Sequence, residues 1–133
     1  IAMYYAGDYL TMLENTPDLA YVVPKEGSNW FVDAMCVLKD AQHKEEAEEW
    51  INFIAGTDAC LANMDYIWYA SPNAEALAEY PDYYQETYGE ALDMGLYEIM
   101  AAPQEVLDRC TLYENLPAET LTLYNDLWTE LGI

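Results

Sequence analysis

The sequence predicts an α/β protein in which helices outnumber strands and the strands form a partly parallel sheet. Short apolar runs rich in Val and aromatic residues are typical of buried strands, and residues 29–38 (NWFVDAMCVL) are the clearest example. Other stretches repeat apolar residues every three or four positions, as amphipathic helices do. With 53% hydrophobic and 14% aromatic residues, the 133-residue chain is apolar enough to form one ordinary core.

The first part of the chain is expected to form short strands around one short helix. Residues 2–6 (AMYYA) have a strand-like composition. Asp8 is a plausible N-cap for a helix over 8–15 (DYLTMLEN), because its carboxylate can accept a hydrogen bond from a free backbone N–H. A second strand is expected at 19–23 (LAYVV), where Pro24 closes it.

Two helices are expected to follow the apolar run. Residues 44–56 (KEEAEEWINFIAG) place apolar side chains at three-four spacing, and Gly56 is expected to stop the helix. Residues 57–68 (TDACLANMDYIW) are expected to form the next helix, with Thr57 or Asp58 as its cap.

The carboxy-terminal part is predicted to end in an amphipathic helix. A short helix is expected to start at Asn73, whereas residues 80–100 are aromatic and acidic and favour no single element. Pro103 lies where a first helical turn is expected. Residues 117–131 (PAETLTLYNDLWTEL) form the terminal helix, which Gly132 ends. One face of that helix carries an apolar stripe of Leu121, Tyr124, Leu127, Trp128 and Leu131.

The charge of the chain restricts its partners. It carries 25 acidic against 4 basic residues, a formal net charge of −21. Such a surface repels nucleic-acid phosphates and anionic lipids and concentrates cations near any cleft. We therefore expect no nucleic-acid partner. The same charge is also compatible with a surface that serves only solubility.

The sequence shows no motif of an enzyme or of a metal site. Cys36, Cys60 and Cys110 are widely spaced, and we expect free thiols, with the first two buried in apolar surroundings. The sequence holds no GxSxG, HExxH or P-loop motif, and its lone His43 lies in a polar loop. An acidic calcium-binding or structural module is an alternative, but EF-hand spacing does not occur. We expect no catalytic residue, metal or cofactor.

Asp33 is the one charged residue of the run 29–38. An unpaired carboxylate in a buried strand is costly, because it loses its hydration without gaining a partner. Residues two apart share one face of a strand, so Phe31 and Asp33 are expected to point the same way and Trp30 the opposite way. Asp33 therefore caps a neighbouring helix, pairs with Lys25 or Lys39, or lies at a cleft where it meets a cationic ligand.

Residues 24–73 closely resemble the carboxy-terminal half of the spermidine/putrescine-binding proteins of ABC importers. The matching pieces are the PKEG loop, an aromatic pair followed by x-Asp, a helix ending in INF, and a Tyr-x-x-Pro-Asn turn. The likeness extends over residues 1–75 and, less closely, over the terminal helix. It implies the carboxy-terminal portion of a two-lobed periplasmic-binding-protein fold of type II, and the opening at Ile1 likewise leads us to expect part of a longer chain.

The resemblance also implies how the chain divides between lobes. Residues 1–32 would belong to lobe two, residues 33–78 would return to lobe one, and residues 79–133 would go back to lobe two with the terminal helix. Expected partners are a polyamine and the permease subunits of an ABC importer, outside the cytoplasm, in a periplasm or as a cell-surface lipoprotein. The chain alone is expected to self-associate.

In the resembled family the polyamine lies between the lobes, where its ammonium groups meet acids and its methylenes meet aromatic rings. The resemblance therefore implies a set of ligand-binding side chains in this sequence. These are Asp33, Phe31, Tyr69, Tyr5, Trp30 and Glu114. A receptor for another organic cation is the alternative within the same class.

Overall fold

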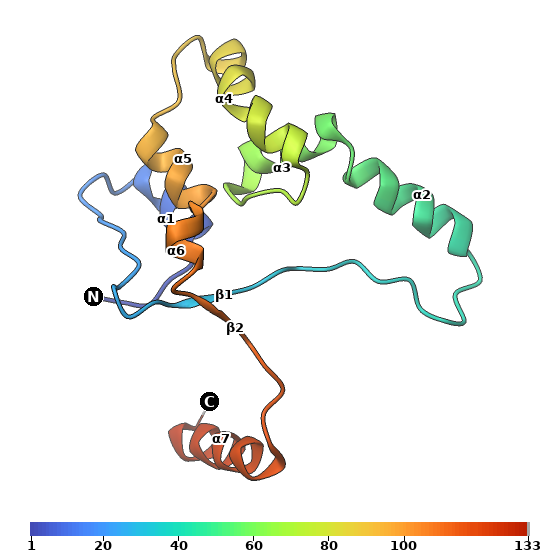
Figure 1. Ribbon diagram of the computed structural model, residues 1–133, viewed down its shortest axis with the longest axis vertical. Coiled ribbons are helices and arrows are strands. Elements are labelled where there is room, and N and C mark those ends of the chain that lie inside the picture. The colour runs from blue at the N-terminus through green and yellow to red at the C-terminus, as the bar shows by residue number, and fades with distance from the viewer. Residues whose placement is uncertain (133) are drawn as a thin grey trace.

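The computed structural model describes residues 1–132 and is helix-rich, with two strands of two residues each (Figure 1). The strands pair in parallel, with Asn29 opposite Thr111 and Trp30 opposite Leu112. The elements are, in chain order, α1 (Ala6–Leu13), β1 (Asn29–Trp30), α2 (Lys44–Ile54), α3 (Thr57–Ile67), α4 (Ala74–Tyr88), α5 (Met94–Met100), α6 (Gln104–Leu107), β2 (Thr111–Leu112) and α7 (Ala118–Leu131). The predicted mixture of many helices and a few parallel strands is confirmed to this extent.

The core lies where α3 packs against α4 and where α1 contacts α3 and α5. Tyr80 of α4 and Met64 of α3 are its largest fully buried side chains. Further rings surround Tyr80: the Trp68 ring meets it edge-on at 6.5 Å between centroids, and the Tyr97 ring stacks on it at 6.5 Å. Burial of these large rings is the main stabilising term available to this small core.

Asn73 begins α4, as the sequence predicts. Its side-chain oxygen accepts hydrogen bonds from the backbone N–H groups of Glu75 and Ala76, at 2.9 and 3.1 Å. Its amide nitrogen donates to the Ala55 carbonyl at 3.0 Å, just beyond the end of α2. One cap therefore satisfies free donors of α4 and ties its start to the end of α2.

The helix α4 continues through Pro81 to Tyr88, in a region where the sequence favoured no element. A proline has no N–H, so it leaves the carbonyl four residues earlier without its helical hydrogen bond. That carbonyl belongs to Leu77, and the Tyr97 hydroxyl of α5 donates to it at 2.8 Å. The side chain of a neighbouring helix thus replaces the missing hydrogen bond.

The expected strands are mostly wrong. Only Asn29 and Trp30 of the run 29–38 belong to a strand, and residues 31–38 are extended without strand pairing and almost entirely exposed. Neither 2–6 nor 19–23 forms a strand. The compositions favour extended backbone, but strands also need neighbours to pair with, and β2 offers only two residues to β1.

Two local predictions are corrected in the same way. Asp8 lies inside α1 and not at its cap, because the helix begins earlier and Tyr5 occupies the N-cap position. Cys36 is exposed instead of buried, since the extended segment that carries it is uncovered, whereas Cys60 is buried as predicted. All three cysteines are free thiols.

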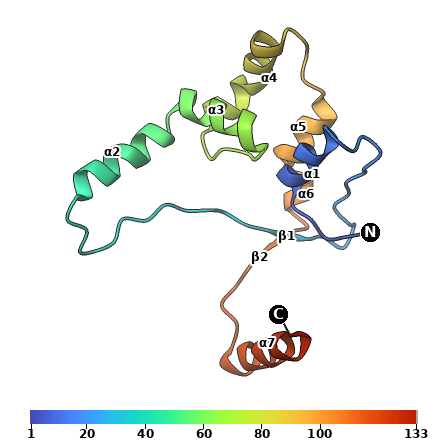
Figure 2. The same ribbon diagram turned by 180° about the vertical axis from the view of Figure 1, so that it is seen from behind.

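Two helices project away from the core. Figures 1 and 2 show α2 at the end of the long extended segment and α7 on its own beyond β2. The predicted terminal helix and its end at Gly132 are confirmed, yet every residue of its apolar stripe is about half exposed or more. None of the helices in residues 1–132 combines the length and apolarity needed to cross a bilayer.

Candidate functional site

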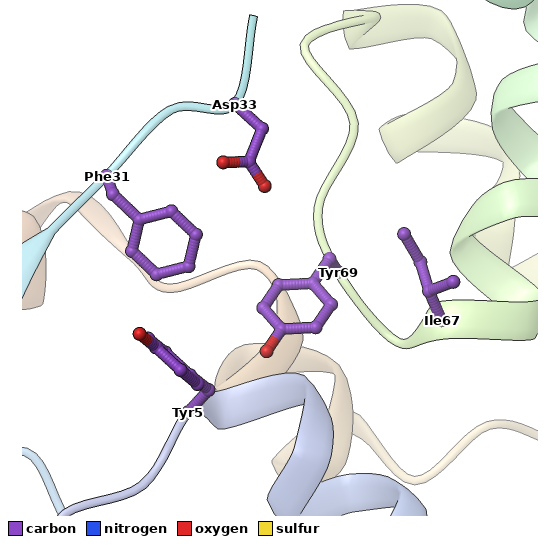
Figure 3. Close-up of a pocket in the computed structure, with 5 residues that line it drawn as sticks. All are labelled: Tyr5, Phe31, Asp33, Ile67 and Tyr69. Atoms are coloured by element: carbon purple, nitrogen blue, oxygen red, sulfur yellow. The ribbon is translucent and has the colours of Figure 1, made fainter.

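A cavity of about 400 Å³ opens between the extended segment after β1, the turn after α3 and the start of α1. Five side chains line it: Tyr5, Phe31, Asp33, Ile67 and Tyr69. Figure 3 shows the Phe31 and Tyr69 rings on opposite sides, with Tyr5 below them and the Asp33 carboxylate directed into the space above. Segments distant in sequence thus meet at one place.

The alternation of an extended backbone brings Phe31 and Asp33 to the same cavity, whereas Trp30, the last residue of β1, does not line it. The Phe31 ring meets the Tyr5 ring edge-on at 5.4 Å between centroids, and it lies 6.4 Å from the Tyr69 ring. Three rings therefore surround one carboxylate.

Tyr69 follows directly after the residue that ends α3. That residue, Trp68, has a left-handed backbone with φ 56° and ψ 37°, and its N–H donates to the Met64 carbonyl at 2.9 Å. Burial raises the pKa of the Tyr69 hydroxyl, and the nearby negative charge of Asp8 raises this pKa further. Tyr69 thus keeps its proton at neutral pH and offers both an aromatic face and a hydroxyl.

Asp33 reaches the cavity without a protein cation. Within residues 1–132 no ion pair or hydrogen bond involves its carboxylate, and Lys25 instead lies 3.9 Å from Glu26. The two alternatives in which Asp33 caps a helix or pairs with a lysine therefore find no support. Because Asp33 is exposed, its charge remains hydrated and carries no burial cost in this chain.

Two of the six predicted ligand-binding residues lie outside the cavity. Trp30 is in β1 opposite Leu112, and Glu114 is exposed in the stretch between β2 and α7. Their contact with a ligand stays a prediction. His43 is exposed at the start of α2, with its Nδ1 3.4 Å from a carboxylate oxygen of Glu46.

The sequence did not single out Ile67, and it assigned Asp8 only a capping role. Ile67 lies two residues before Tyr69, at the end of a helix whose apolar residues all look like core residues. Asp8 lies one helical turn after Tyr5, so it lies near the cavity that Tyr5 lines. No local signal distinguishes either residue from an ordinary helix position.

The lining can hold a cation attached to an apolar body. Aromatic faces attract cations and also pack against methylene groups, and a carboxylate supplies the opposite charge. The cavity thus combines one negative charge with apolar walls, an arrangement suited to binding such a cation.

Comparison with known proteins places the chain in a family. Residues 1–87 match the family described as bacterial extracellular solute-binding protein. This match covers more than half of the chain, and the chain therefore belongs to that family. Proteins of this family are in general non-catalytic. No solved structure matches the chain.

Two characterised relatives are similar to nearly the whole chain, and a third is similar to about half of it. The putrescine-binding periplasmic protein SpuD of Pseudomonas aeruginosa is 26% identical over 139 residues, which cover 98% of this chain and 35% of the relative. The norspermidine sensor of Vibrio cholerae is 29% identical over 125 residues, covering 92% and 32%. The putrescine-binding periplasmic protein PotF of Escherichia coli is 30% identical over 63 residues, covering 47% and 17%. The chain thus spans about a third of the length of the first two relatives.

Proposed function

We propose that this chain forms part of a polyamine receptor, the substrate-binding component of an ABC importer, and that its aromatic cavity holds one ammonium group of the ligand. The observation that carries the proposal is the convergence of three aromatic rings and one unpaired carboxylate on a single cavity of about 400 Å³. The names of the relatives, two putrescine-binding proteins and a norspermidine sensor, support the same ligand class.

The chemistry of a polyamine explains why both kinds of side chain are needed. A polyamine is a flexible hydrocarbon with positive charges at intervals, so its site needs anions separated by apolar walls. An ammonium over an aromatic face gains about 0.5–2 kcal/mol, depending on how much water is excluded. Asp33 supplies the full charge, and the rings of Tyr5, Phe31 and Tyr69 supply the walls. The net charge of −21 adds a long-range attraction for any polycation.

The cavity forms one side of a larger site under this proposal. Tyr5 is 56% exposed and Phe31 is 41% exposed, so both residues remain accessible to a ligand or a second wall. We assign residues 1–32 and 79–133 to one lobe of a two-lobed receptor and residues 33–78 to the other. The continuous helix α4 then carries the chain across the second boundary. The same receptor would act outside the cytoplasm and deliver its ligand to permease subunits.

Calorimetry on the protein at its natural length tests the proposal. Putrescine, spermidine and the neutral diol of the same length as putrescine are titrated in turn. We expect at least one polyamine to bind with a dissociation constant of about 1 μM or lower and the diol not to bind, because only the amines carry the charge that Asp33 meets. Absence of binding by both amines, or equal binding of the diol, would refute the proposal.

A further inference from the structure

The ring of Tyr69 rests on the backbone of α1 at Gly7. Gly7 is buried in the first turn of that helix. A Cβ atom at this position would overlap the Tyr69 ring, because its three nearest atoms all belong to that ring and the farthest of them, Cζ, would be only 2.7 Å away. The present place of the ring therefore requires that residue 7 has no side chain.

The other neighbours of Tyr69 prevent an easy adjustment. Trp68, the preceding residue, is the one non-glycine residue with positive φ in the described part of the chain. Its ring packs against those of Tyr80 and Tyr84, at centroid distances of 6.5 and 6.2 Å. Because the core holds Trp68, the backbone that leads into Tyr69 is fixed from one side while Gly7 sets the limit from the other.

The space into which the Tyr69 ring can move is the cavity. On the side away from α1 the ring faces Phe31 across a centroid distance of 6.4 Å (Figure 3). A side chain at position 7 would push the ring in that direction, toward Phe31 and the Asp33 carboxylate. The gap between the two rings would then narrow.

We propose that Gly7 is a positioning residue of the ligand cavity: by lacking a side chain it lets Tyr69 lie against α1 and keeps the space between Tyr69 and Phe31 open. The expected effect of Gly7 on ligand binding rests on the proposed function, because the open space would accommodate the hydrocarbon of an amine. The placement of the ring itself can be tested without a ligand.

Phenylalanine labelling gives a direct measure of that placement. Within these 133 residues the two phenylalanines are Phe31 in the cavity and Phe53 in α2, so labelled phenylalanine rings report on both places. Gly7→Ala is expected to shift the Phe31 signal and leave Phe53 unchanged. Gly95→Ala is the matched control, a glycine at the start of α5 whose Cβ would approach only an Asp93 side-chain oxygen, and it should shift neither signal.

A Tyr69→Ala background shows whether the Tyr69 ring causes the shift of the Phe31 signal. In Tyr69→Ala the ring is gone, so adding Gly7→Ala is expected to produce no further shift of Phe31. The proposal is overturned if Gly7→Ala leaves Phe31 unmoved in the natural background, or if it shifts Phe31 equally in both backgrounds. Should Gly7→Ala prevent folding, the double variant must fold as well as Tyr69→Ala alone, since removal of the ring makes the room; continued misfolding overturns the proposal too.

Binding supplies the functional half of the test. Gly7→Ala is expected to weaken putrescine binding at least about tenfold, and Gly95→Ala less than about twofold. If Gly7→Ala shifts Phe31 but leaves putrescine affinity unchanged, the link from ring position to binding is wrong. If the unsubstituted protein binds neither putrescine nor spermidine, the proposed function fails, while the ring signals still decide whether Gly7 positions Tyr69.

Discussion

Asp33 is a candidate ligand because no lysine or arginine within residues 1–132 pairs with its carboxylate. The four lysines and arginines of the chain are distributed elsewhere, and the lysine ion pairs within the described residues join Lys25 to Glu26 and Lys44 to Glu48. Within residues 1–132, the carboxylate beside the three rings therefore has no cationic side chain paired with it. A cationic ligand that enters the cavity meets a charge that is free to pair with it.

Replacing Asp33 by asparagine removes this charge while keeping the size of the side chain. We expect Asp33→Asn to weaken putrescine or spermidine binding at least about tenfold, because breaking one half of a desolvated charge pair costs about 2–5 kcal/mol. Calorimetry on the protein in its natural length measures the change.

The matched control is Asp40→Asn, an equal change of charge at an exposed turn outside the cavity. Asp40→Asn is expected to alter affinity less than about twofold, through the overall field alone. Equal effects of the two substitutions would mean that Asp33 contributes only to the general negative charge and contacts no ligand.

At the level of elements, Pro81 explains why the second half of α4 was not predicted. A proline in a helix interior costs about 3 kcal/mol, so a sequence argument favours a break there. The Tyr97 hydroxyl offsets part of that cost by donating to the Leu77 carbonyl, and Tyr97 belongs to another helix. Whether α4 continues through Pro81 therefore depends partly on a side chain of α5, which the sequence of α4 alone does not reveal.

This compensation makes a prediction about coupling between two residues. Tyr97→Phe is expected to lower the free energy of unfolding by about 1–3 kcal/mol, because the Leu77 carbonyl loses its donor. In a Pro81→Ala background the new N–H can serve that carbonyl, and Tyr97→Phe should then cost clearly less. Urea unfolding of the four proteins measures the difference.

Tyr83→Phe is the control, since Tyr83 stacks on Tyr80 in the same cluster and its hydroxyl makes no hydrogen bond within residues 1–132. It should change stability little in either background. If Tyr97→Phe costs the same with and without Pro81, the hydrogen bond to Leu77 does not compensate for the proline.

Features that depend on one segment of the chain could be predicted from the sequence, whereas features that depend on contacts between segments could not. The helices at 44–54, 57–67 and 118–131 follow from periodicity within each segment, and the convergence of Phe31 and Asp33 follows from alternation along one extended segment. Tyr5 and Tyr69 were indicated by resemblance. The absence of strand pairing at 31–38 could not be inferred, because pairing depends on partner strands that the composition of the segment does not reveal.

At the scale of the whole molecule, the described chain exposes more surface than a compact monomer. Its accessible surface is 10849 Å², whereas a folded monomer of 15.2 kDa exposes about 7,100 Å². Much of this surface is apolar, including the stripe of α7 and a second cavity of about 350 Å³ between residues 35–37 and α2. The difference of about 3,700 Å² exceeds the area that each partner buries in an ordinary protein complex.

The 133-residue chain studied by itself is therefore expected to self-associate. The apolar faces favour association, whereas the net charge of −21 opposes it, so raising the salt concentration should strengthen association by screening the repulsion. Sedimentation velocity at low and high salt measures the effect. A hydrophobic interface without this charge would show a much weaker dependence on salt.

Two substitutions on α7 identify the surface involved. Leu127→Asp and Thr122→Asp each add one negative charge to the same helix, but Leu127 belongs to the apolar stripe whereas Thr122 lies on the opposite face. Leu127→Asp should weaken association well beyond Thr122→Asp, since it places a charge in a contact that would otherwise exclude water. A chain that stays monomeric at every salt concentration would show that the exposed apolar faces do not drive self-association. Equal effects of the two substitutions would assign the association to charge alone and not to the stripe of α7.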